Sequence, residues 1–250
     1  MTDDSLALTC QLENSLLKVW PSFSTMMVDG WAVRLGGGYS GRANSASALQ
    51  IGATLTSTQL EDIEVHYREA GLPSTVRITP LAAPQMLELL NGRGYVTVAD
   101  SLTQIADLIQ QPSATNVLLG EKADEPWLNG VCRSQSGAKR FPEKLHAIVS
   151  RIQVPHRFAT LVMDGQPCAF GLGAIDGDWA ELGCIMVDAD KRGTGCGRAI
   201  VTSLMAWAQA VGAGHAFLQV DEKNAPALKL YERLGFRTLY PYKTLMLRNP

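Results

Sequence analysis

The sequence predicts a mixed α+β fold in which a central, mostly antiparallel sheet is flanked by helices. Residues 157–187 contain three strand-like runs joined by two Asp-Gly turns, a pattern typical of consecutive hairpins. A glycine-rich loop at 192–197 is followed by apolar residues at helical spacing. Strand and helix then alternate to the end of the chain, so we expect a mixed sheet with helices on its faces.

The second half carries the clearest pattern. After the glycine-rich loop, apolar residues recur at i, i+4, i+7 and i+11 from Ile200, which predicts an amphipathic helix that ends near Gly212. A shorter helix follows, with Asn224 as its N-cap and Gly235 at its C-terminal end. The elements expected here are helices at 141–152, 200–212 and 224–236 and strands at 157–163, 167–175, 179–187, 216–220 and about 236–247.

The first hundred residues repeat part of this order in weaker form. A connection at 108–118 separates the repeats, so we expect two segments, 1–112 and 113–250. When the two halves are aligned by their glycine and aromatic residues, Leu90 falls at the position of Tyr231 and Ala83 at that of Asn224. The first half therefore keeps the order of strands and helices but has apolar residues at the positions of Tyr231 and Asn224. Its expected elements are strands at 30–35, 74–79 and 94–100 and helices at 57–71 and 83–95.

Length and composition limit the functions that the chain can have. With 250 residues, 46% of them hydrophobic, it can bury a substantial core. A net charge of −2 gives no bulk attraction for nucleic acid or for an anionic bilayer, so neither is expected as a partner. The N-terminus has no apolar run of signal length, and no segment approaches the roughly 20 apolar residues of a membrane span. We therefore expect a cytoplasmic protein.

The cysteines predict neither disulfides nor a metal site. There are five, at positions 10, 132, 168, 184 and 196, an odd number without a CxxC pair or a histidine at ligand spacing. We expect reduced thiols and no bound metal.

The glycine-rich loop predicts an anion site. A strand, a glycine-rich turn and a helix N-terminus together direct unpaired amides and the helix dipole at whatever lies before the helix. The glycines of 192–197 have no Cβ to hold an anion away from those amides, and Lys191, Arg192 and Arg198 add positive charge. The alternative is a helix start with incidental glycines.

Two common phosphate motifs fit this loop poorly. A Walker loop needs Gly-Lys-Ser/Thr, but Gly197 is followed by Arg198 and Ala199. A dinucleotide fingerprint needs a third glycine where this chain has Arg198 or Ile200. Asp221, at the end of the next strand, lies where a ribose-binding acid is expected. The hairpins before the loop nevertheless contradict the βαβ start of a dinucleotide-binding fold.

A third motif fits. The stretch RGTGCG at 192–197 matches R/Q-x-x-G-x-G/A, and the series N-x-x-A-x-x-L-Y-x-x-x-G-F begins at Asn224. In this order and on these elements, the two motifs resemble the GNAT superfamily of acyl-CoA-dependent N-acyltransferases. The resemblance spans about 157–240. The first half resembles the degenerate half of two-part members of that superfamily.

The resemblance implies acetyl-CoA as the co-substrate. The loop amides would hold its pyrophosphate, and its pantetheine arm would lie along the strand 179–187, entering where this strand and 216–220 separate. No metal is implied. The cofactor-binding residues implied are Ile185, Met186 and Val187 on the strand, Arg192, Gly193, Thr194, Gly195, Cys196, Gly197 and Arg198 in the loop, and Asn224.

The resemblance also implies two catalytic residues. Tyr231 would protonate the leaving thiolate, although a tyrosine at this spacing also suits a core position. Glu181 would act as general base, with a water chain or a merely exposed glutamate as alternatives. Strand alternation puts Glu181 on one face with Gly183, Ile185 and Val187. Because direct transfer needs no acyl-enzyme, we interpret the Cys196 thiol as space-filling.

The sequence therefore predicts an N-acetyltransferase that moves an acetyl group from acetyl-CoA to a primary amine of a small molecule or a peptide. The first alternative is a non-catalytic acetyl-CoA-binding regulatory module, and a weaker one is a nucleotide-dependent oxidoreductase. Arg42 and Asn44 either contact the acceptor or fix the interface between the halves. A homodimer is left open.

Overall fold

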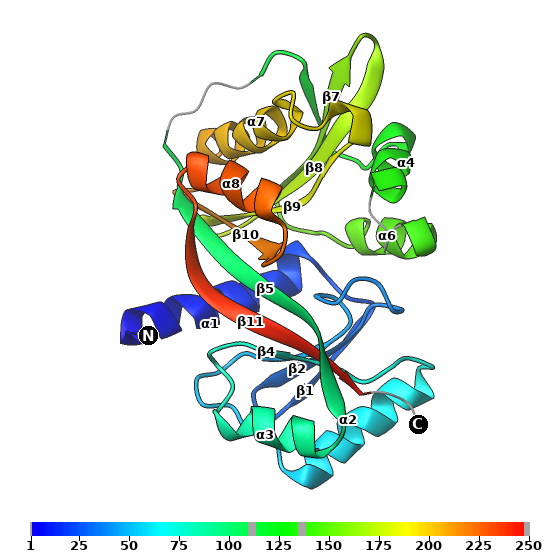
Figure 1. The fold of residues 1–250 in the computed structure, drawn as a ribbon, viewed down its shortest axis with the longest axis vertical. Coiled ribbons are helices and arrows are strands. Elements are labelled where there is room, and N and C mark those ends of the chain that lie inside the picture. Colours follow the sequence, from blue (N-terminus) through cyan, green and yellow to red (C-terminus); the bar gives the residue numbers. More distant parts are fainter. Residues whose placement is uncertain (1, 110–113, 135–138, 248–250) are drawn as a thin grey trace. The chain divides into compact units, whose positions relative to one another are not determined.

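The computed structural model describes residues 2–109, 114–134 and 139–247, and its elements fall into two units (Figure 1). The first unit holds Met1–Thr103, Asp221–Lys223 and Thr238–Pro250, and the second holds Gln104–Val220 and Asn224–Arg237. The boundary expected between 112 and 113 lies outside the described residues, so the division into 1–112 and 113–250 stays a prediction. The structure adds that the end of the chain returns to the first unit.

The first unit has the strand order β1-β2-β3-β4-β11-β5. Strands β3 and β4 are parallel, whereas β1–β2, β2–β3 and β4–β11 pair antiparallel. The elements are α1 (Asp3–Val19), β1 (Ser24–Val28), β2 (Trp31–Leu35), β3 (Ala46–Ala48), α2 (Ser57–Glu69), β4 (Thr75–Ile78), α3 (Gln85–Gly92), β5 (Tyr95–Asp107) and β11 (Arg237–Leu247).

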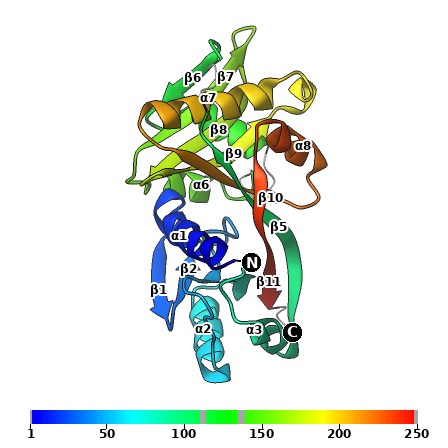
Figure 2. The same ribbon diagram turned by 90° about the vertical axis from the view of Figure 1, so that its left-hand side faces the viewer.

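The second unit has the strand order β5-β10-β9-β8-β7-β6. Helix α7 packs on one face of β7–β9 (Figure 2), and α4 packs on the other (Figure 1). The expected mixed, mostly antiparallel sheet flanked by helices is confirmed. The elements are β6 (Val117–Gly120), α4 (Glu125–Ser134), α6 (Pro142–Val149), β7 (His156–Met163), β8 (Gln166–Asp176), β9 (Trp179–Val187), the 3-10 turn η1 (Ala189–Lys191), α7 (Cys196–Ala210), β10 (His215–Asp221) and α8 (Ala225–Arg233).

The Asp-Gly pairs form the predicted tight turns. Asp164 and Gly165 have φ of +53° and +73°, the double left-handed geometry of a type I′ hairpin turn. Gly177 has φ of +61° in the next turn. These turns set the register in which β7, β8 and β9 pair antiparallel.

Helices α3 and α8 end in the same way. The amide of Gly94 donates to Asn91 O after α3, and Gly235 donates to Glu232 O after α8, both at 3.0 Å. The two glycines have φ of +89° and +85°. Leu90 and Tyr231 each lie four residues before this glycine, but that the first half repeats the second stays a prediction.

A buried ion pair holds the α1 face of the first unit. Arg77 donates to both oxygens of Glu13 at 2.9 and 3.0 Å, and each of the two side chains is 1% exposed. Tyr240 donates to Glu13 at 2.7 Å, and Arg77 also donates to Ser47 at 3.2 Å. Burial lowers the pKa of Arg77, but the Glu13 carboxylate outweighs it and the pKa lies above its usual range. Glu13 thus neutralises a cation that water cannot reach.

Removal of this carboxylate should destabilise the protein strongly. We expect Glu13→Ala to lower the free energy of unfolding by about 3–5 kcal/mol, because Arg77 would remain charged and buried. Urea unfolding measures the change. Asp100→Asn, which breaks an exposed ion pair with Lys243, should cost less than about 1 kcal/mol. Equal losses in the two variants would contradict the role given to the buried pair.

Candidate active site

The N-terminus of α7 presents backbone amides without a side-chain cap. Its N-cap is Gly195, which has φ of +93° and no side chain to accept a hydrogen bond. The first backbone bond of the helix runs from Ala199 N to Gly195 O at 3.0 Å. The amides of Cys196, Gly197 and Arg198 precede that bond and have no acceptor within the helix. Together with the helix dipole they form an anion-binding arrangement.

The three loop glycines have different roles. An added Cβ at Gly193 or Gly195 would meet nothing within 4 Å, so the main chain is open to a ligand at both positions. At Gly197 the same atom would lie 3.3 Å from Leu230 and 3.5 Å from Val187. The missing side chain of Gly197 therefore lets α7 approach α8, and only the first two glycines open the loop.

The loop side chains mainly fix the loop itself. Arg192 Nε donates to Val187 O at 3.3 Å, and Thr194 Oγ1 donates to Lys191 O at 2.6 Å. The Cys196 side chain is 3% exposed and points into the protein. Burial, followed by the neighbouring Cys196 thiol, raises the pKa of Cys168 to about 11. This packing agrees with a space-filling role for Cys196.

Strand β9 contains a β-bulge that the sequence did not reveal. In the register with β8, Gly183 and Met186 lie opposite residues that are only two apart. Cys184 and Ile185 therefore share one opposite residue, Gly171. Cys184 has φ of +52°, a left-handed conformation that is uncommon for a residue with a side chain.

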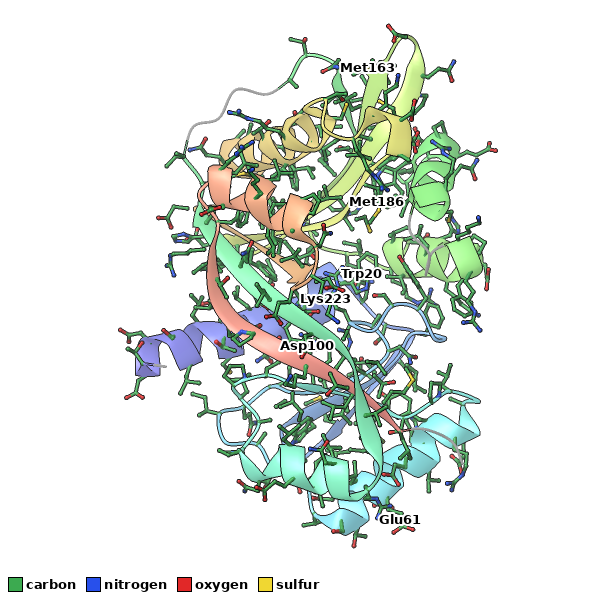
Figure 3. All side chains as sticks on the ribbon, in the orientation of Figure 1. Trp20, Glu61, Asp100, Met163, Met186 and Lys223 are labelled. Carbon is green, nitrogen blue, oxygen red and sulfur yellow. The ribbon has the colours of Figure 1, made fainter. Side chains whose placement is uncertain are left out.

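The bulge corrects the predicted face of β9. Alternation was expected to put Glu181, Gly183, Ile185 and Val187 together, but the extra residue reverses the alternation after Gly183. Ile185 and Val187 lie on the α7 side of the sheet. By the register, Met186, which is labelled in Figure 3, shares the face of Glu181. The prediction was wrong for the two residues that follow the bulge.

Strands β9 and β10 separate where the site lies. Within the described strands, their parallel ladder runs from His215–Trp179 to Phe217–Glu181 and ends there. The edge of β9 over 182–187 is thus not covered by the β10 ladder. The separation of these strands, expected from the resemblance, is present.

The ladder with β8 tells which backbone groups reach this open edge. Asp188 N donates to Cys168 O at 2.9 Å, so the residues at this pair direct their backbone groups at β8. Because such pairs alternate in an antiparallel ladder, Met186 also faces β8 with its amide. Ile185 and Val187 direct theirs at the open edge. Of the three strand residues predicted to bind the cofactor, Ile185 and Val187 thus face the open edge with their backbone groups, and Met186 does not.

The structure brings Glu181 and Tyr231 together. Glu181 is fully buried, and its two carboxylate oxygens would each lie 3.0 Å from a Cβ added at Gly183, so the carboxylate extends over that glycine. Tyr231 is 6% exposed. Burial, and after it the charge of Glu181, raises the pKa of Tyr231 to about 12. The phenol therefore remains protonated at physiological pH.

Two predicted asparagine sites have structural roles. Asn224 caps α8, since its Oδ1 accepts from Ala227 N at 3.3 Å. Asn44 lies in the first unit, where its Oδ1 accepts from Gly36 N at 3.0 Å and Gly38 N at 3.2 Å. Asn44 thereby fixes its own glycine-rich loop.

Helix α4 supports the end of β9 through contacts that the sequence did not indicate. Arg133 makes a two-pronged ion pair with Asp188, with distances of 3.3 and 2.9 Å. Trp127 Nε1 donates to Gly171 O at 2.9 Å and its side chain is fully buried, so it is a core residue. Helix α4 is thus joined to the end of β9 through Asp188 and to β8 through Gly171.

Across the described ranges 2–109, 114–134 and 139–247, no helix has the length and apolar character needed to cross a membrane. In the same ranges, no three His, Cys, Asp or Glu side chains are grouped to hold a metal ion.

The left-handed conformation of Cys184 predicts that alanine is tolerated better than valine at this position. Cys184→Val keeps the side-chain size, but a β-branched residue tolerates the left-handed conformation poorly. We expect this variant to be about 1 kcal/mol less stable than Cys184→Ala. Thermal unfolding of both variants checks the difference. A valine variant as stable as the alanine variant would contradict the left-handed geometry.

Comparisons with known proteins place the chain in a family. The model of the family described as "Probable histone acetyltransferase Rv0428c C-terminal" matches residues 9–245. The "Uncharacterized N-acetyltransferase YobR" of Bacillus subtilis (strain 168) is 23% identical over 233 residues, which cover 90% of this chain and 93% of that protein.

Two further similarities concern a shorter segment and the fold. The "[Ribosomal protein bS18]-alanine N-acetyltransferase" of Escherichia coli (strain K12) is 36% identical over 87 residues, 32% of this chain and 59% of that protein. The solved structure of a GCN5-related N-acetyltransferase from Kribbella flavida has a TM-score of 0.73 at 17% identity, with 96% of each chain covered.

Proposed function

This chain belongs to the family described as "Probable histone acetyltransferase Rv0428c C-terminal", and we propose that it transfers an acetyl group from acetyl-CoA to a primary amine. Its fold and its curated relatives identify it as a GNAT-type acyltransferase. One observation carries the proposal. The open edge of β9 is followed along the chain by the uncapped amides before α7. Glu181 lies on this same strand, and Tyr231 of α8 is close enough for the charge of Glu181 to raise its pKa.

The open backbone suits the two parts of the co-substrate. The amides of 193–198 would bind the pyrophosphate, with Arg198 exposed beside them. Ile185 and Val187 would bind the pantetheine amides as a strand binds a peptide. An amide at the bulge would donate to the thioester carbonyl and stabilise the oxyanion. These assignments include Gly193, Gly195 and the amide of Cys196, and leave Asn224 as a cap.

The two buried groups suit the proton transfers. Direct attack requires the amine to lose one proton and the departing sulfur to gain one. Glu181 would take the proton of the ammonium group, because its carboxylate extends toward the open part of β9. Tyr231, protonated at neutral pH, would give its proton to the thiolate and regain one from solvent or from Glu181. No acyl-enzyme is needed, so the buried thiol of Cys196 has no chemical step.

We propose a peptide or small-molecule amine as the acceptor. The bS18-alanine N-acetyltransferase is named for an alanine of ribosomal protein bS18, and the family is named for histones. Both names support amines of polypeptides, and a panel of peptides with free N-termini, lysine peptides and small amines covers the acceptor class.

Replacement of the proposed proton donor tests the mechanism. We expect Tyr231→Phe to lower kcat about 10²-fold or more on any accepted amine, because the thiolate would leave unprotonated. The dissociation constant for acetyl-CoA should not change. Release of free thiol gives the rate, and calorimetry gives the affinity. An unchanged kcat would remove the role of Tyr231, and tight acetyl-CoA binding without turnover on the whole panel would favour a non-catalytic module.

Gly183 should act through the carboxylate beside it. We expect Gly183→Ala to lower kcat at least 10-fold, since the new Cβ would lie 3.0 Å from both oxygens of Glu181 and displace them. Glu181→Gln is expected to lower kcat by a similar or larger factor. In the Glu181→Gln background, Gly183→Ala should then have little further effect. Two fully additive losses would show that Gly183 acts independently of Glu181.

A further inference from the structure

A polar side chain stands on β10 where that strand leaves β9. Strand β10 reads HAFLQVD, and Phe217, Leu218 and Val220 are buried apolar residues around Gln219. Gln219 itself is half-buried, and its Nε2 is shielded from solvent. A carboxamide held inside an apolar strand needs polar surroundings, so its place in the sheet matters.

The register puts Gln219 beside the Glu181 carboxylate. Phe217 lies opposite Glu181 in the last pair of the parallel ladder, so the two side chains share a face. Two residues further on, Gln219 comes level with Gly183, on that same face and across the gap between the strands. The Glu181 carboxylate extends over Gly183. The carboxylate and the carboxamide therefore converge at one level of the open edge.

We propose that Gln219 positions the acceptor amine, an inference that rests on the acetyl transfer proposed above. The attacking amine, once deprotonated, has two N–H bonds and one lone pair. After the Glu181 carboxylate has taken one proton from the ammonium group, rotation about the C–N bond turns the lone pair toward the thioester, and one N–H bond then points at the other carboxyl oxygen of Glu181. The Gln219 amide oxygen accepts a hydrogen bond from a second N–H, which fixes the direction of the lone pair toward the thioester. Because a carboxamide is neutral, it adds this contact without a second negative charge beside Glu181.

The test compares Gln219→Leu with a matched control. Gln209→Leu makes the same change on α7, where Nε2 of Gln209 donates to Leu108 O at 3.0 Å and takes no part in the site. The probes are alaninamide and ethylamine, small amines that have few contacts beyond the amino group. Free-thiol release at saturating acetyl-CoA gives kcat and KM for each amine.

We expect Gln219→Leu to lower kcat/KM for both amines at least 10-fold. The KM for acetyl-CoA and the Tm should stay at the wild-type values, which a merely structural role would not allow. Gln219→Glu, which can still accept a hydrogen bond, should keep more activity than the leucine variant. Gln209→Leu should retain wild-type kcat/KM per folded protein.

Three results would overturn the inference. If the wild type is active and Gln219→Leu is equally active, Gln219 has no positioning role although the proposed function stands. If Gln219→Leu loses acetyl-CoA affinity or Tm in proportion to its rate, Gln219 is structural. If the wild type binds acetyl-CoA but acetylates neither amine nor any member of the peptide panel, the proposed function fails, and the role of Gln219 fails with it.

Discussion

The constraint on which the site depends is an interrupted β-ladder. Strand β10 leaves β9 after Phe217 and Glu181, and beyond this point the bulge at Cys184 reverses the alternation of β9. A buried sheet normally satisfies every backbone group, so unpaired amides at this depth are stable only if another partner takes them. The interruption therefore defines both where a peptide-like ligand binds and where catalytic side chains can reach it.

In the first unit, helix α2 begins in a different way. The N-terminus of α2 is closed by a capping box. Thr56 N donates to Gln59 Oε1 at 2.8 Å, and Gln59 N donates to Thr56 Oγ1 at 3.2 Å. In the parallel pair β3–β4, Ser47 accepts a hydrogen bond from Arg77, and Glu13 of α1 neutralises the Arg77 cation. We propose on these grounds that the first half is degenerate: its helix N-terminus satisfies its own amides and its sheet face is filled.

The sequence predicted what depends on local chemistry. The hairpins and α8 could be predicted from the sequence because their signals act within a few residues. These signals are the Asp-Gly turns, the N-cap Asn224 and the left-handed Gly235. The short strands β1, β3 and β6 were not predicted, because pairing with neighbouring strands and not local pattern makes them. Helices α1 and α4 were missed as well, although α1 has local signals in its N-cap Thr2 and in the acidic residues of its first turn. The bulge escaped for the same reason, since Cys184 is left-handed only because of the register with β8. The ion pair Arg133–Asp188 joins residues far apart in the sequence and had no local signal.

The most direct test of the account is a crystal structure of the full chain with coenzyme A. The account predicts pyrophosphate oxygens within hydrogen-bond distance of amides in 193–198 and pantetheine amides bonded to Ile185 and Val187 at the open edge of β9. A coenzyme bound elsewhere, with these amides facing protein or bulk solvent, would contradict it.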